Sequence, residues 1–191
     1  WSVEWSSSTN PPVTAPLDAV AYGYSSCTGM ATFVAYVARA VGIPARVAGA
    51  PCWNSGPFAG LASHNPNVSQ CWHGGSARQH GSDYLYNHNW VEVWLGPSTS
   101  AEQDLTGGWA FIEGAPAGGG EGFARPCDKW FCDKARFGLT DGPNRTRVFA
   151  TAFDRAAASG VSYPMAWDLA NDDIAGVERT ALYEQACGSC P

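Results

Sequence analysis

Apolar side chains recur at helical spacing in the stretch of the chain that follows Cys27. These apolar positions are Met30, Phe33, Val34, Val37, Ala38 and Val41. Steps of three and four residues predict an α-helix that buries one face. Ser25 and Ser26 are candidate N-caps, and Gly42 with Pro44 should end the helix. Cys27 is therefore predicted to lie at the start of a packed helix.

Three further stretches have the pattern of β-strands. Residues 45–50 directly follow the predicted helix, and residues 90–94 alternate bulky side chains with valine, which is a period-two pattern rich in β-forming residues. Residues 109–112 predict the next strand, after a connection that contains glycine and proline turn signals. His88 lies at the entrance to the second of these strands, and Glu113 lies at the end of the third.

The rest of the chain is richer in loops. Residues 1–16 are expected to be extended, residues 51–87 to form a long irregular insertion, and residues 115–147 to form a second loop-rich stretch. The elements expected later in the chain are strands at 148–153 and 161–167 and a helix from about Val177 to near Cys187. We predict an α+β fold and a single domain over residues 1–191, with a core at about 15–115 and a C-terminal extension at 116–191.

The composition indicates a packed protein and excludes nucleic acid and membrane partners. Charged residues make up 15% of the 191 residues and aromatic residues 13%, which favours a packed fold over a disordered chain. The net charge of −6 provides no basic surface for nucleic acid. No apolar run reaches membrane-spanning length, so no membrane partner is expected. The residues after Trp1 lack the pattern of a signal peptide, so we expect a mature or excised domain. The sequence leaves the oligomeric state open.

The predicted position of Cys27 suits a nucleophile. The first N–H groups of a helix lack intrahelical acceptors, and the positive end of the helix dipole lies there; both features favour a thiolate and lower the pKa of a cysteine. The same N–H groups could hold the oxyanion of a tetrahedral intermediate. Taken alone, a small apolar residue at the start of a core helix remains the commoner explanation.

His88 and Glu113 would supply the other parts of an acyl-transfer site. An imidazole at a strand entrance can reach a neighbouring helix start, and a carboxylate on the next strand can bind its far nitrogen and fix its tautomer. The alternatives are a solvated strand end for Glu113, and a surface or cross-strand charge for Glu92.

Together these segments resemble the transglutaminase-like core. The motifs that carry the resemblance are Ser-Cys-Thr-Gly at 26–29, Arg-Ala-Val-Gly-Ile-Pro-Ala-Arg at 39–46, His-x-Trp-Val-Glu-Val from His88 and Trp-x-Phe-x-acid from Trp109. The resemblance covers about residues 15–115 and looks closest to the stand-alone bacterial and algal branch. It implies a papain-like α+β fold in which the nucleophile heads a helix that packs on an antiparallel β-sheet.

The resemblance also implies roles for individual residues. Cys27 is the expected nucleophile, His88 the general base and acid, and Glu113 the orienting carboxylate. The third residue of this family is usually aspartate, so Glu113 departs from the pattern. A second oxyanion donor is expected from an upstream side chain, often tryptophan or glutamine. The sequence does not locate this donor, and Trp5 is the only upstream tryptophan near enough to consider.

The segment 51–87 is too long for a plain connection and leads into the strand that carries His88, which is typical of a functional loop. The residues expected to bind substrate are Trp53, Trp72, Tyr84 and Trp90. The loop histidines, His64, His73 and His80, lack the register of metal ligands and are expected to be solvated. No metal site, calcium loop or other cofactor is predicted.

The seven cysteines suggest an oxidising compartment. With Cys27 set aside as a thiol, six remain, which is enough for three disulfide bonds. The sequence-local pairings are Cys52–Cys71, Cys127–Cys132 and Cys187–Cys190, and a zinc site at the last pair is the less favoured alternative. Glycosylation sequons at Asn67 and Asn144 agree with secretion. We therefore expect a secreted or extracytoplasmic glycoprotein.

The predicted site allows several reactions. In transglutamination, Cys27 attacks a glutamine side chain of a protein or peptide, ammonia leaves, and an amine resolves the thioester. Resolution of the thioester by water would make a cysteine peptidase or an amidase, including one that acts on N-glycans. The non-enzyme alternative is a catalytically idle binding module, against which the complete Cys-His-acid set argues. The sequence does not choose between an amine and water.

Overall fold

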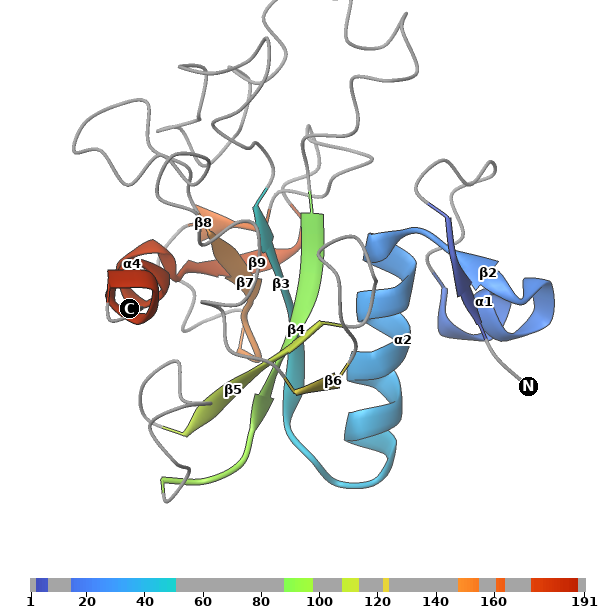
Figure 1. Cartoon of the computed structure of the whole chain (residues 1–191), viewed down its shortest axis with the longest axis horizontal. Coiled ribbons are helices and arrows are strands. Elements are labelled where there is room, and N and C mark those ends of the chain that lie inside the picture. Colours follow the sequence, from blue (N-terminus) through green and yellow to red (C-terminus); the bar gives the residue numbers. More distant parts are fainter. Residues whose placement is uncertain are drawn as a thin grey trace, which may run out of the picture. The chain divides into compact units, whose positions relative to one another are not determined.

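The computed structural model describes residues 3–6, 15–50, 88–97, 108–113, 122–123, 148–154, 161–163 and 173–188. The chain divides into two compact units, and each is described by itself (Figure 1). The first unit contains β1 (Glu4–Trp5), α1 (Pro16–Tyr22), β2 (Tyr24–Ser25), α2 (Cys27–Ala40), β5 (Trp109–Glu113) and β6 (Gly122–Phe123). It also contains most of β3 (Ala45–Ala50), up to Ala48, and most of β4 (His88–Trp94), starting at Asn89. The second unit contains the remaining residues of β3 and β4, together with β7 (Phe149–Thr151), β8 (Val161–Ser162), β9 (Ala175–Glu178) and α4 (Thr180–Gly188).

The strands of the first unit lie in the order β6-β5-β4-β3. β4 and β5 are antiparallel, and their register pairs Val91 with Ile112. The backbone N–H of Trp94 donates to the carbonyl of Pro44 at 2.8 Å, which joins the end of β4 to the residue before β3, as in an antiparallel pair. This arrangement confirms the predicted α+β fold with an antiparallel sheet.

Small side chains pack α2 onto this sheet. Ala31 and Ala35 are buried against Val91 and Val93 of β4, and Ala110 of β5 belongs to the same core. Because alanine projects little beyond the helix surface, α2 can approach the sheet closely along β3 and β4 (Figure 1). The helix predicted after Cys27 is confirmed, and it packs on the sheet as expected.

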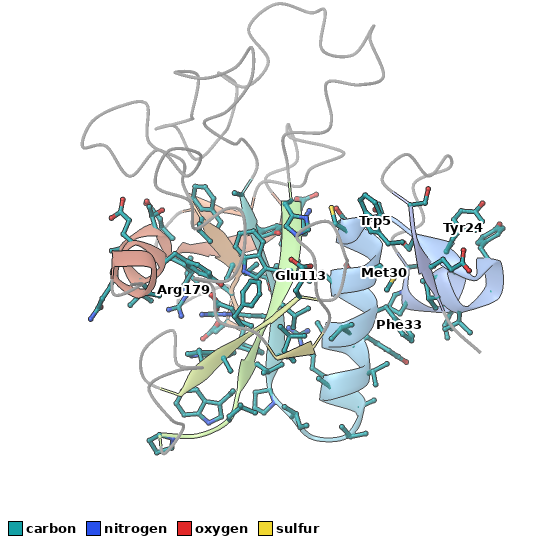
Figure 2. The ribbon with its side chains drawn as sticks, viewed as in Figure 1. Trp5, Tyr24, Met30, Phe33, Glu113 and Arg179 are labelled. Atoms are coloured by element: carbon teal, nitrogen blue, oxygen red, sulfur yellow. The ribbon has the colours of Figure 1, made fainter. Side chains whose placement is uncertain are left out.

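The buried face of α2 differs in part from the predicted one. Val37 and Val41 are exposed, by 44% and 70%, although the helical spacing assigned them to the buried face. Met30 and Phe33 point from α2 toward α1 rather than toward the sheet (Figure 2). α2 therefore packs on α1 as well as on the sheet, which divides its partly buried apolar positions between two partners, whereas Val37 and Val41 face solvent.

A short strand pair precedes the start of α2. β1 and β2 are parallel, with Trp5 opposite Ser25. Pro16 lies in the first turn of α1, where a missing N–H costs nothing, and Gly23 ends α1 in the left-handed region with φ 73°. This turn allows the chain to leave α1, pair with β1 and enter α2 within a few residues. The spacing of apolar residues predicted the helix that follows Cys27 but neither α1 nor β2 before it.

The second unit combines a small antiparallel sheet with a helix. Its strands lie in the order β7-β9-β8, and both pairs are antiparallel. The hydroxyl of Thr180, at the start of α4, accepts from the N–H of Val148 at 3.0 Å and donates to Glu178 at 2.9 Å. Tyr163 and Tyr183 are fully buried. The helix predicted from about Val177 to near Cys187 is confirmed as α4, but it begins at Thr180, because Val177 lies in β9 and pairs with Ala150.

Several predicted features fall outside the described residues. The insertion 51–87 lies outside them entirely, and so do the two sequon asparagines, Asn67 and Asn144. Of the stretch 115–147, the structure describes Gly122 and Phe123. Within the described ranges, none of the helices is long and apolar enough to cross a membrane. The single-domain organisation stays a prediction.

Candidate functional site

Cys27 is the first residue of α2 and is 8% exposed. Its sulfur is a thiol rather than half of a disulfide bond. Ser26 is the N-cap: its backbone is extended and its hydroxyl accepts from the N–H of Gly29 at 3.4 Å. The N–H of Met30 then donates to the carbonyl of Ser26 at 2.9 Å, which closes the first turn. The thiol therefore lies at the positive end of a 14-residue helix.

His88 is the first residue of β4 and is 2% exposed. Strand periodicity gives it the same face of β4 as Trp90 and Glu92, whereas Asn89 and Val91 share the opposite face. The prediction placed His88 at the strand entrance, and the strand begins at this residue.

A hydrogen bond joins the start of β4 to the start of α2. The side-chain amide Nδ2 of Asn89 donates to the hydroxyl of Thr28 at 2.8 Å. Thr28 is 1% exposed and Asn89 is 3% exposed, so the bond is buried. Asn89 is the neighbour of His88 in sequence, and Thr28 is the neighbour of Cys27. Neither residue was a candidate from the sequence, since no periodicity relates positions 61 residues apart.

Glu113 is the last residue of β5 and is fully buried, so its interpretation as a solvated strand end is wrong. It pairs with Gly122 of β6 in the antiparallel register. Strand periodicity gives Glu113 the same face of β5 as Phe111, and Phe111 pairs with Glu92. The carboxylate of Glu113 therefore belongs to the face of the sheet that turns away from the apolar contact with α2.

A buried ion pair lies further along that face. Arg46 Nη2 is 2.7 Å from Glu92 Oε2, and Arg46 Nε donates to the same oxygen at 2.8 Å. The guanidinium carbon lies 4.2 Å from the ring centroid of Trp109. Glu92 is fully buried, so its interpretation as a surface charge is wrong and the cross-strand charge is confirmed. The role of Arg46 was not predicted, because its partner lies 46 residues away in the sequence.

Trp5 carries a buried donor close to the start of α2. Within the described part of the chain, its indole Nε1 is buried and has no hydrogen-bond partner. β1 places Trp5 opposite Ser25, two residues before Cys27, and the N–H of Ser6 donates to the carbonyl of Ser25 at 2.8 Å. Figure 2 shows Trp5, on β1, next to the N-terminal end of α2. A buried donor without an acceptor is rare and calls for an explanation.

A comparison with known protein families matches the part of the chain that contains Cys27, His88 and Glu113. The family model described as the transglutaminase-like superfamily, transglutaminase core, matches residues 2–113. The match covers more than half of the chain and includes Trp5, Cys27, His88 and Glu113. The chain belongs to the transglutaminase-like superfamily. No curated protein matches the chain, and no solved structure does. For a transglutaminase-like protein, thiol-dependent acyl transfer or hydrolysis is the expected class of chemistry.

Of the remaining candidates, the structure describes Trp90 and the backbone of Cys187. Trp90 is fully buried, and its ring lies 5.9 Å from that of Phe111, which is the environment of a core residue; we therefore leave it out of the proposed site. Cys187 lies in α4, and its side chain is not among those described. The predicted residues outside the described ranges are Trp53, Trp72, Tyr84, Cys52, Cys71, Cys127, Cys132 and Cys190. Among the described side chains, no cluster of histidine, cysteine and carboxylate groups has the arrangement of a metal site.

Proposed function

We propose that this transglutaminase-like protein transfers the acyl group of a protein-bound glutamine to an amine, through a thioester on Cys27. The thiolate attacks the amide carbon, the carbon–nitrogen bond breaks, and His88 donates the proton that lets ammonia leave. An amine then attacks the thioester, His88 accepts its proton, and the thiolate is released. Glu113 holds the imidazole in the required tautomer.

The observation that carries this proposal is the position of Cys27 as the first residue of a long, capped helix within the matched family core. First-turn N–H groups have no intrahelical acceptor, so they are available to an anion such as the oxyanion of the tetrahedral intermediate. The Asn89–Thr28 hydrogen bond supports the role of His88, because it ties the residue after His88 to the residue after Cys27.

The indole of Trp5 is the proposed second donor to the oxyanion. Its Nε1 is buried beside the segment that leads into Cys27, and it has no partner among the described residues. A donor held ready in this way forms its hydrogen bond when negative charge develops on the substrate oxygen. Such an interaction lowers the barrier of the chemical step more than it favours substrate binding.

We expect Trp5→Phe to lower kcat by about 10²-fold and to leave KM within about twofold, since the ring is kept and the N–H is lost. The matched control is Trp94→Phe, because Trp94 lies at the end of β4 opposite to His88 and is 37% exposed. Steady-state kinetics of both variants provide the comparison. If kcat falls equally in the two, Trp5 is not an oxyanion donor.

We expect Glu113→Gln to lower kcat/KM by tens to about a thousandfold, because glutamine can still contact the imidazole but cannot stabilise the imidazolium. The loss should be smaller than that caused by removing the imidazole itself. Kinetics at several pH values measure the effect. A silent Glu113→Gln variant, found together with an inactive variant at another carboxylate, would show that the third residue lies elsewhere.

The alternative reaction is hydrolysis of the same thioester by water, as in a cysteine peptidase or an amidase acting on peptides or glycan-linked amides. The test is product analysis with a glutamine-containing peptide, in the presence and absence of a primary amine. Transglutamination predicts an amine-linked peptide whose yield rises with amine concentration. If the peptide glutamine is only converted to glutamate, at a rate that does not depend on the amine, the protein is a hydrolase. If neither product forms, the result supports an idle binding module.

Other parts of the proposal concern residues whose side chains the structure does not describe. Trp53, Trp72 and Tyr84 are proposed to bind the protein or peptide substrate, and the six remaining cysteines to form three disulfide bonds. These bonds agree with a secreted or extracytoplasmic protein. Thiol counting on the denatured protein, with and without a reductant, distinguishes one thiol from seven.

A further inference from the structure

The buried hydrogen bond between Asn89 and Thr28 occupies a distinctive place in the packing of α2 on β4. From Val93 to Val91, the contact of β4 with α2 is apolar and is made with alanines of the helix. The next position of β4 on the same face is Asn89. There the contact becomes polar, with Asn89 Nδ2 at 2.8 Å from Thr28 Oγ1.

The two kinds of contact constrain the packing differently. Apolar packing of alanine on valine is non-directional and tolerates a small slide of the helix along the strand. A hydrogen bond is directional, since it weakens steeply when the donor angle or the distance departs from its optimum. The Asn89–Thr28 bond therefore fixes how far α2 lies along β4, and it does so at the end where Cys27 begins the helix.

We propose that Thr28 and Asn89 are positioning residues, which set the separation of the Cys27 thiol and the His88 imidazole by fixing the start of α2 against the start of β4. The inference rests on the proposed function, in which these two groups exchange a proton. Thr28 follows Cys27 and Asn89 follows His88 in the chain. The Asn89–Thr28 hydrogen bond therefore fixes the positions of the two backbone segments that carry the reacting groups. A misplacement of about 1 Å can lower the rate of such a step by about 10²-fold.

The test uses Thr28→Val, which keeps the shape of the side chain and removes the acceptor. We expect kcat to fall by about 10- to 100-fold with KM within about twofold. We also expect the pH profile for alkylation of Cys27 by iodoacetamide to move toward that of an ordinary thiol, whose pKa is about 8.5. Thr28→Ser restores the hydroxyl and should restore both properties.

Two further variants separate positioning from stability. Thr28→Val with Asn89→Leu replaces both polar partners by apolar groups, so it should recover most of the stability lost in Thr28→Val but not the rate. Thr180→Val is the matched control: Thr180 is also 1% exposed and its hydroxyl also makes buried hydrogen bonds, but in the second unit. It should lower the melting temperature and leave both kcat and the alkylation profile unchanged.

Each outcome decides the proposal. If the double variant regains kcat together with stability, or if Thr180→Val lowers kcat as much as Thr28→Val, the bond is structural only and the proposal fails. Alkylation needs no substrate, so it tests positioning even when the glutamine reaction is absent. If His88→Ala shifts the alkylation profile and Thr28→Val does not, positioning fails while the thiol–imidazole pair stands. If His88→Ala does not shift it, the pair itself is wrong and the positioning proposal falls with it.

Discussion

His88→Ala is expected to lower kcat/KM for the glutamine reaction by about 10³-fold or more, which is the largest loss of activity among the variants considered. A thiolate without its imidazolium partner can still attack the amide carbon, but no group then protonates the leaving ammonia. The tetrahedral intermediate therefore reverts to the substrate and does not go on to the thioester. Single-turnover kinetics measure the acylation step directly, apart from product release.

The fold of the His88→Ala variant should remain intact, because β4 keeps its pairing with β5 from Val91 to Trp94. Near-UV circular dichroism and thermal unfolding provide that control. Added imidazole should recover part of the lost rate if the ring is missing only as an acid and base. A well-folded variant with unchanged kcat/KM would remove His88 from the mechanism.

Arg46→Met should produce the largest loss of stability, with a decrease of about 3–5 kcal/mol in the free energy of unfolding. Methionine fills much of the same volume, but it leaves the carboxylate of Glu92 fully buried without its cation. It also removes the guanidinium from the face of Trp109. Urea denaturation gives the free energy of unfolding and its denaturant dependence.

The double variant Arg46→Met with Glu92→Leu tests the cause of this loss. Replacing both charges by apolar groups should recover most of the stability, since the cost arises from one uncompensated buried charge. Arg39→Met is the matched control: Arg39 Nε donates to the carbonyl of Ala45 at 2.6 Å from an exposed side chain, and its loss should cost about 0.5–1.5 kcal/mol. If Arg46→Met costs no more than Arg39→Met, the buried pair does not hold the sheet together.

The start of α2 could be predicted from the sequence because all of its signals are local. The N-cap Ser26, the apolar spacing after Cys27 and the helix end before Gly42 lie within one stretch, and the structure reproduces that stretch as Cys27–Ala40. The strand over residues 45–50 was predicted with the same boundaries for the same reason. The thiol at a helix start followed directly from these elements.

Other parts of the fold depend on contacts between distant segments. β9 was not predicted, and the helix expected from about Val177 overlapped its end, because the strand conformation of β9 comes from pairing with β7 and β8, which local spacing does not reveal. Burial of Glu113 and Glu92 likewise follows from the neighbouring strands and, for Glu92, from Arg46. The donor of Trp5 was considered from the resemblance alone, and the parallel pairing of β1 with β2 is what places it beside the nucleophile segment.

The central claim is that Cys27 forms a thioester with the acyl group of glutamine. Peptide mapping by mass spectrometry, after rapid acid quench of the protein with a glutamine-containing peptide and no amine, tests it most directly. The account predicts an adduct on Cys27 equal to the peptide minus ammonia, which disappears when a primary amine is added before the quench. Cys27→Ala should give no adduct. An adduct on another residue, or turnover of the peptide by Cys27→Ala, would contradict the account.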